Sequence, residues 1–152
     1  MMTIKQMAEA TGTSPDTLRY YEREGLLPRV PRAANGYRQY DKMSVRRVRF
    51  VRAAQRIGFT LEEIRALSLL RSDGGARCRD VRRLAAAKRE ELRDKIRLME
   101  AMSAALGDLI GVCVNDWRGL DDCPILAALE RGLALPEGDA ADFSRSDPGA
   151  GA

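Results

Sequence analysis

Three patterns in the sequence predict a mainly α-helical protein. Two short helical segments are joined by a tight turn within residues 3–25, an Asn35-Gly36 pair follows, and apolar residues recur at alternating steps of four and three from Leu92 to Cys113. These patterns are typical of a helix-turn-helix unit, a two-stranded wing and a coiled coil, in that order. We therefore expect a winged helix-turn-helix domain, then a long antiparallel coiled-coil dimerisation helix, and finally a short loop and helix.

Capping residues mark the first two helices. A capping box begins at Thr3 and its helix ends at Gly12, while Ser14-Pro15 opens a second helix that ends at Gly25. The second helix of such a unit enters the major groove of DNA. The residues of this helix that we expect to face DNA are Ser14, Thr17, Arg19, Tyr20 and Arg23.

The next segment predicts a small two-stranded wing. Asn-Gly is a strong hairpin signal because both residues tolerate positive φ. The pair separates an arm that starts at Leu26 from a second arm at residues 37–40. Proline in the first arm confines it to an edge strand. Arginines suited to phosphate oxygens lie on both arms, at Arg29, Arg32 and Arg38.

Two further helices complete this domain. Asp41 is the expected N-cap of a helix that ends at Gly58, and Thr60 opens a capping box for a shorter helix that runs through Leu70. A hinge at residues 72–75 follows. The side chains that we expect to pack inside the domain rather than contact DNA are Leu18, Tyr21, Phe50 and Phe59.

The stretch from Cys78 to Cys113 predicts one long amphipathic helix. Its apolar stripe has the spacing of a coiled-coil seam, and Ser103 is its one polar member. A single helix of this kind cannot bury its stripe, so we expect it to pair with the same helix of a second chain. Packing against its own domain is the alternative. The predicted dimer-interface residues are Leu92, Ile96, Met99, Leu106 and Ile110.

Charge is unevenly distributed along the chain. Residues 1–60 carry 12 Lys/Arg against 5 Asp/Glu, whereas residues 101–152 carry 3 against 9. A basic N-terminal part is expected of a phosphate-binding surface. The sequence contains no long apolar run and no signal-peptide core, which predicts no membrane span and a cytoplasmic, reducing location. With no histidine, phosphate loop or nucleophile–base pair, an enzyme is not expected.

Three motifs resemble the MerR family of bacterial transcription regulators. They are TLRYYEREGLL at residues 17–27, NGYRQY at 35–40 and GFTLEEI at 58–64, and the resemblance extends over about residues 3–132. It implies a homodimer on a promoter with an over-long spacer, which the dimer distorts when an effector binds so that RNA polymerase holoenzyme can engage. The resemblance also implies DNA contacts by Arg19 and Tyr20 of the second helix and by Tyr37 and Arg38 of the wing.

The cysteines indicate the effector. Cys78 lies at the start of the long helix, Cys113 at its end and Cys123 after a loop, which are the ligand positions of the metal sensors that the chain resembles. The resemblance implies a site shared between protomers, with Cys78 from one chain and Cys113 plus Cys123 from the other. The alternatives are three packing cysteines, or a redox switch in which Cys113 and Cys123 form a disulfide.

The metal is predicted to be a soft divalent ion. Copper sensors of this family typically carry serine at the first position, so Cys78 indicates a divalent ion. Thiolate ligands favour soft metals, and three sulfurs satisfy mercury or lead, or cadmium with little help. Zinc normally takes four ligands, so Asp116, Asp121, Asp122 or water would have to supply the fourth. We therefore expect mercury, lead or cadmium ahead of zinc.

The expected domain organisation follows from these elements. Residues 1–71 form the winged helix-turn-helix domain with its helix pair, and residues 76–112 form the dimerisation helix. Residues 113–135 form the metal-binding loop and short helix. Residues 136–152, rich in Gly, Ala, Ser, Asp and Pro, are expected to be disordered.

Overall fold

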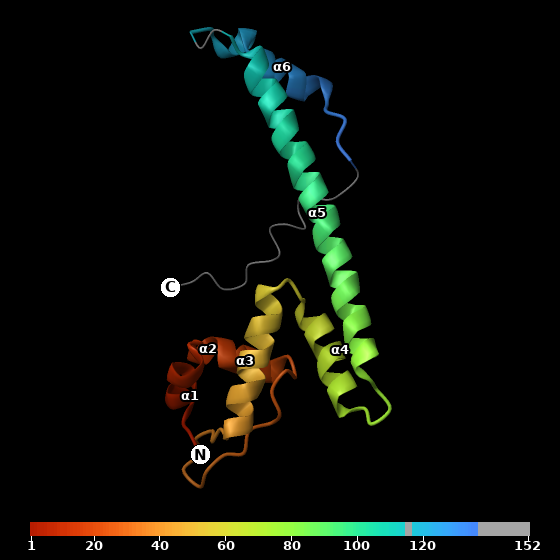
Figure 1. Ribbon diagram of the computed structural model, residues 1–152. Coiled ribbons are helices and arrows are strands. Elements are labelled where there is room, and N and C mark those ends of the chain that lie inside the picture. The colour runs from red at the N-terminus through yellow and green to blue at the C-terminus, as the bar shows by residue number, and fades with distance from the viewer. Residues whose placement is uncertain (115–116, 137–152) are drawn as a thin grey trace. The chain divides into compact units, whose positions relative to one another are not determined.

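The computed structural model describes residues 1–114 and 117–136. Within these ranges the chain is mainly helical, with six α-helices and a short 3-10 helix, η1 (Figure 1). The chain divides into two compact units within the longest helix, one ending at Lys88 and the other beginning at Arg89. None of the helices in the described ranges combines the length and apolarity needed to span a bilayer.

The helix-turn-helix unit forms as predicted from α1 (Ile4–Thr11) and α2 (Pro15–Arg23). Thr3 caps α1 by accepting a hydrogen bond from the backbone N–H of Gln6 at 3.3 Å. Ser14 caps α2 in the same way. Between the helices the chain passes through Gly12 at φ +62°, a left-handed conformation that favours glycine. The local signals in the sequence therefore placed both helices correctly.

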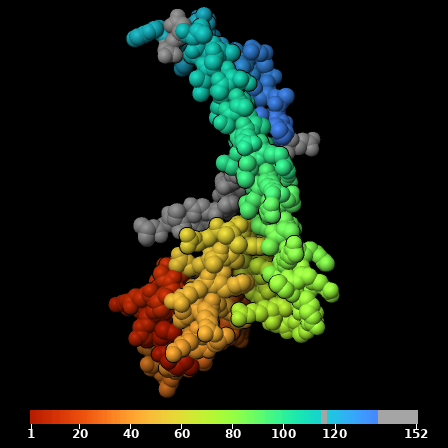
Figure 2. All heavy atoms as spheres, in the orientation of Figure 1, coloured from red at the N-terminus to blue at the C-terminus, as the bar shows by residue number. Residues whose placement is uncertain are grey.

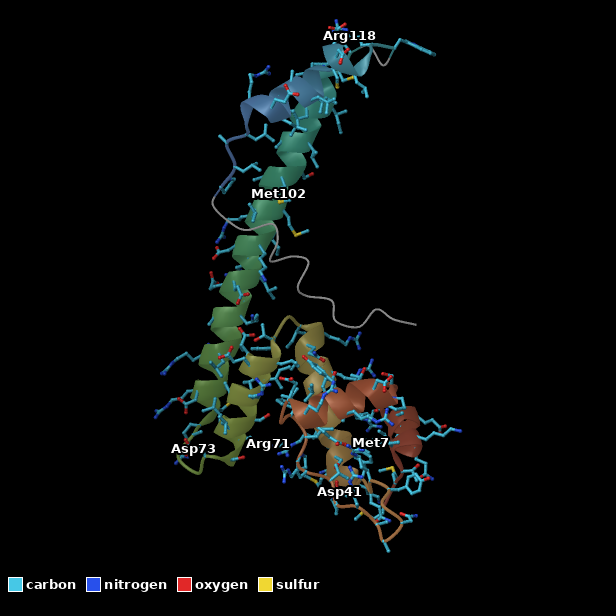
Figure 3. All side chains as sticks on the ribbon, turned by 180° about the vertical axis from the view of Figure 1, so that it is seen from behind. Met7, Asp41, Arg71, Asp73, Met102 and Arg118 are labelled. Atoms are coloured by element: carbon cyan, nitrogen blue, oxygen red, sulfur yellow. The ribbon has the colours of Figure 1, made fainter. Side chains whose placement is uncertain are left out.

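Helices α3 (Lys42–Arg56) and α4 (Leu61–Ser72) complete the first unit. Helix α1 contacts α2 and α3, and α3 contacts α4 (Figure 1). Met7 lies within this packed group (Figure 3). The expected burial of Leu18 and Tyr21 is confirmed, and Phe50 and Phe59 pack partly buried against the core. The core residues are Met7, Leu18, Tyr21, Leu26, Leu27, Tyr40, Val48, Val51, Ala54 and Ile64.

The wing is less regular than predicted. A single antiparallel bridge joins Arg32 to Arg38, and no longer strand forms within the described residues. Proline in the first arm removes an amide donor, which limits the ladder. The turn uses the conformational tolerance of only one of its two residues, because Gly36 takes a positive φ of +80° and Asn35 does not. Instead, the Asn35 side chain accepts a hydrogen bond from the backbone of Tyr37 at 3.2 Å.

The long helix α5 is continuous over Cys78–Val112. Its predicted seam is exposed in the single chain, from 39% at Leu92 to 67% at Ile110. The alternative, in which the stripe packs against its own domain, would require these side chains to be buried. The buried apolar positions on α5, Leu98 and Leu109, lie off the seam.

The chain ends, as far as it is described, with η1 (Leu120–Asp122) and α6 (Pro124–Arg131). Figure 2 shows α6 and residues 132–136 against one side of the C-terminal half of α5. Pro124 and Ala128 of α6 line a hollow there together with Leu109 and Val112 of α5. Helix α6 therefore covers a side of α5 other than the seam. The proposed disordered tail, apart from Pro136, lies outside the described residues.

Candidate nucleic-acid interface and metal ligands

The predicted recognition helix, α2, presents a basic surface. Arg19 is about half exposed and pairs with Asp16, with Nη1 and Oδ1 2.7 Å apart. The Arg23 guanidinium lies over the Tyr20 ring, 5.9 Å from its centroid. Cation–π stacking of this kind holds an arginine in place while its donors stay available. Arg19, Tyr20 and Arg23 thus come from one short helix, as a set of DNA-facing residues requires.

Ser14 and Thr17 have a capping role in this structure. The Ser14 hydroxyl accepts from the Thr17 backbone N–H at 3.2 Å and lies 2.8 Å from the Thr17 hydroxyl. Both residues stand at the N-terminal end of α2, where backbone amides and the helix dipole favour an anion such as a phosphate. Direct contact with DNA by these two hydroxyls stays a prediction.

The wing presents Tyr37, which is 69% exposed. Arg38, the other wing residue predicted to contact DNA, donates from Nε to Glu22 of α2 at 2.9 Å. This ion pair joins the wing to the recognition helix. Phosphate contact by Arg38 stays a prediction, and its Nη atoms would have to make that contact.

Two guanidinium groups, which the sequence did not single out, hold the C-terminal ends of the helix-turn-helix pair. Arg52 of α3 donates from Nη1 to the carbonyl oxygens of Thr11 at 2.5 Å and Gly12 at 2.8 Å, at the end of α1. Arg65 of α4 donates to the Glu24 carbonyl at 2.8 Å and to its carboxylate at 2.6 Å, at the end of α2. A cation at the C-terminus of a helix also complements its dipole.

Hydroxyl and carboxyl groups around the recognition helix have shifted pKa values. Burial, followed by the hydrogen bond to Glu22, raises the pKa of Tyr40. Burial also raises the pKa of Tyr21, whose hydroxyl donates to Gln55 at 2.7 Å. Hydrogen bonds from the backbone and hydroxyl of Ser44 lower the pKa of Asp41, at the start of α3 (Figure 3). Both tyrosines therefore remain neutral donors at physiological pH.

Lys88 joins the first turns of α5 to α4. Its side chain is 6% exposed, with Nζ 2.9 Å from Glu63 Oε1 and 5.8 Å from the centroid of the Phe59 ring. A lysine buried to this extent needs such a partner. Nothing in the sequence distinguished it from the many exposed cations of the long helix.

The three cysteines occupy the helix ends, as the sequence indicated. Cys78 is the first residue of α5 and is exposed, while Cys113 follows α5 and Cys123 precedes α6, both partly buried. A helix the length of α5 spans about 50 Å, so Cys78 and Cys113 of one chain cannot meet. Within the described residues, no group of three His, Cys, Asp or Glu side chains gathers as a metal site.

The chemistry of these donors nevertheless fits a soft metal. Cys78 and Cys123 stand at helix N-termini, and sulfur is the donor type that soft metals prefer. Of the candidate oxygen ligands, Asp121 and Asp122 form part of η1 and are exposed. Asp116 lies outside the described residues.

Comparison with protein families gives two matches. Residues 2–69 match the family described as "MerR HTH family regulatory protein", and residues 45–109 match "MerR, DNA binding". The first match covers the helix-turn-helix unit, the wing and the helix pair. The second runs from α3 into the long helix.

Curated relatives and a solved structure extend these matches to most of the chain. A mercuric resistance operon regulatory protein of Pseudomonas fluorescens is 38% identical over 88% of this chain and 91% of its own. The transcriptional regulator HmrR of Rhizobium leguminosarum is 37% identical over 86% and 99%. A transcription regulator of Ralstonia metallidurans, solved in complex with Lead(II), is 33% identical over 85% and 99%, with a TM-score of 0.77.

Proposed function

The chain belongs to the MerR family of helix-turn-helix regulatory proteins, and from this premise we propose that it is a metal-responsive regulator acting as a homodimer on promoter DNA. Membership in the family makes the chain a DNA-binding transcription regulator rather than an enzyme. The effector, the assembly and the residues that contact DNA are the proposed part. The names of relatives, which include mercuric resistance and Lead(II)-bound regulators, support a metal effector.

The DNA-binding part of the proposal rests on α2 and the wing. Helix α2 enters the major groove with Arg19, Tyr20 and Arg23, and Ser14 and Thr17 at its start face a phosphate. Tyr37 and Arg38 of the wing contact the flanking backbone. On metal binding the dimer distorts the promoter spacer, so that RNA polymerase holoenzyme engages both of its recognition elements. Such a mechanism exploits the deformability of DNA rather than new base contacts.

The observation that carries the metal proposal is a long helix with an exposed seam and a thiol at each end of the helix. Cys78 and Cys113 are 35 residues apart, which is five heptads, so both occupy the same position of the repeat. When two such helices pair antiparallel, the start of one lies beside the end of the other. Cys78 of one protomer then joins Cys113 and Cys123 of its partner, which makes two identical sites for each dimer.

Three thiolates and no histidine favour mercury, lead or cadmium as the bound ion. The ion would supply a bridge between the two protomers. Zinc is the second candidate, because Asp121 and Asp122 are exposed immediately before Cys123 and offer a fourth, oxygen ligand. Changing both to asparagine should weaken zinc binding and leave mercury binding unchanged if only zinc uses them.

Subunit mixing tests the shared site. Neither the Cys78→Ser dimer nor the Cys113→Ser dimer has a complete site. In their heterodimer one site regains all three thiols and the other lacks two. Under reducing conditions, mass spectrometry of the intact mixture should therefore show tight mercury or lead binding at no more than one site in each heterodimer.

The matched control mixes Cys113→Ser with Cys123→Ser. In each site, Cys113 and Cys123 come from the same protomer, so each site of that heterodimer lacks one of the two and holds only two thiols. Tight binding should therefore not return. If the first mixture stays inert while heterodimers are present, the shared site is wrong. If the wild-type dimer binds no soft metal but forms a Cys113–Cys123 disulfide on oxidation, the redox switch replaces the metal sensor.

A further inference from the structure

Glu22 is a carboxylate placed within the basic surface of the recognition helix. It lies between Arg19 and Arg23 in sequence, yet its side chain is only 14% exposed. A carboxylate that is nearly buried requires partners that offset the loss of water. Glu22 has two such partners, and both come from the segment that follows the wing turn.

The first partner is Arg38, whose Nε donates to Oε2 of Glu22 at 2.9 Å. The second is Tyr40, whose hydroxyl donates to Oε1. Side chains two residues apart in an extended segment point to the same side. Arg38 and Tyr40 therefore reach α2 together, and Glu22 uses both carboxylate oxygens to hold them.

Tyr40 itself is fixed on its other sides. Its side chain is 0% exposed, and its backbone exchanges two hydrogen bonds with Met2, at 2.7 and 2.8 Å. The next residue, Asp41, caps α3. Because Tyr40 is fully buried, it does not contact DNA directly, so we expect an effect of its hydroxyl on DNA binding to act through Glu22, the group to which it donates.

We propose that Glu22 is a positioning residue for DNA binding, which docks the wing on the recognition helix through Arg38 and Tyr40. The proposal rests on the DNA-binding role of α2 and the wing given above. It adds that the angle between these two elements is set by one buried carboxylate. Within the described residues a single β-bridge joins the two arms of the wing, so the bonds from Arg38 and Tyr40 to Glu22 are a substantial part of what holds the wing in place.

Simple electrostatics makes the opposite prediction for Glu22. Removing a negative charge from a DNA-binding surface increases attraction for phosphates and should tighten binding. If Glu22 positions the wing, its removal should instead weaken binding, because the wing loses its place on α2. The sign of the change therefore separates the two explanations.

The experiment measures the affinity of full-length dimers for a duplex operator selected with the wild-type chain from a random-sequence pool. Glu22→Gln and Tyr40→Phe should each bind roughly ten-fold more weakly, the size expected when a buried hydrogen bond to a charged group is lost. The control is Asp16→Asn, which removes an exposed negative charge from the same helix and should bind at least as tightly as wild type. The dependence of affinity on salt concentration should become weaker in Tyr40→Phe although the chain loses no charge, because the displaced wing no longer contacts phosphates.

A double-mutant cycle with Arg38 completes the test. In an Arg38→Ala background, Glu22→Gln should weaken binding by clearly less than it does alone. All measurements are made where circular dichroism shows each variant folded, and Arg38→Lys serves as a milder variant that keeps the charge. Wild-type-like or tighter binding by folded Glu22→Gln and Tyr40→Phe overturns the positioning role. Failure of the wild-type chain to select any operator would instead count against the proposed function.

Discussion

The two units of this chain differ in where their apolar side chains lie. In the first unit, up to Lys88, side chains as large as Tyr40, Met7 and Leu18 are fully buried. In the second unit the seam residues remain exposed, with Ile96 at 54% and Ile110 at 67%. The first unit has a buried core, whereas the second carries an apolar surface that is exposed within the described residues and that we propose a second chain covers.

The way each unit is held together differs as well. The first unit combines its core with hydrogen bonds that cross between distant segments, such as Arg52 to the end of α1 and Glu22 to the wing. In the proposed dimer, the seam of the second unit would be stabilised mainly by burial of apolar area, and full burial of one such side chain contributes about 1.5–3 kcal/mol. Substitutions should therefore be able to disrupt either unit while leaving the other intact.

The largest expected effect is loss of the proposed dimer. Ile96→Asp combined with Ile110→Asp would place two charges in each helix of the seam, where burial of an unpaired charge is strongly unfavourable. Sedimentation equilibrium should show a monomer at concentrations where the wild-type chain is a dimer. The first unit should remain folded, with an unchanged helical signal from α1 to α4.

A matched control introduces the same charges off the seam. Ala104 and Gly111 are exposed on α5, and a Cβ atom added at Gly111 would meet no heavy atom within 4 Å. Ala104→Asp combined with Gly111→Asp should remain dimeric. A dimeric seam variant, or a monomeric control, would mean that the interface lies on another surface of the chain.

This contrast also explains how far the sequence could predict the structure. Helix ends were readable because caps such as Thr3, Ser14 and Thr60 bond to residues three positions away. The seam was readable because a helix repeats its faces locally. Both features depend on near neighbours along the chain. The structure reproduces the helix ends and leaves the apolar stripe exposed, while the pairing of two stripes stays a prediction.

Contacts between distant segments were not readable. Arg52 donates to residues about 40 positions earlier in the chain. Lys88 is one of many cations on a charged helix, and only the structure shows that it is buried beside Glu63. The wing was predicted to be more regular than it is. The Asn35-Gly36 pair indicates a turn, but it does not report the backbone hydrogen bonds that proline in the first arm removes. The sequence predicted the candidate metal site only as three positions, because no group of three possible ligands gathers within the described residues of a single chain.

The second prediction disrupts the first unit and spares the seam. Arg52→Met keeps the aliphatic stem but leaves the carbonyl groups of Thr11 and Gly12 without this donor. Because Thr11 is 8% exposed, the loss should cost about 1–3 kcal/mol of the free energy of unfolding. Urea unfolding followed by circular dichroism measures the change, and sedimentation should still show a dimer.

The control for Arg52 is Arg56→Met on the same helix. Arg56 is exposed, so its loss should change the free energy of unfolding by less than about 0.5 kcal/mol. Equal destabilisation by the two variants would show that the hydrogen bonds to the end of α1 are not what stabilises the unit. A dimer weakened by Arg52→Met would show that the two units are not independent.

The smallest expected effect is a pH dependence confined to the first unit. Asp41 caps α3 through Ser44, and these hydrogen bonds hold its pKa below its ordinary value of 3.8. A carboxyl group with a lower pKa in the folded state stabilises that state above the unfolded pKa, and this contribution is lost as pH falls through the folded pKa.

Asparagine can still cap a helix but does not titrate in this range. The difference in thermal midpoint between wild type and Asp41→Asn should therefore be constant from pH 7 to about 5 and shift against wild type as pH falls below about 4. A difference that does not vary with pH would mean that the carboxylate charge at the start of α3 adds nothing to the cap.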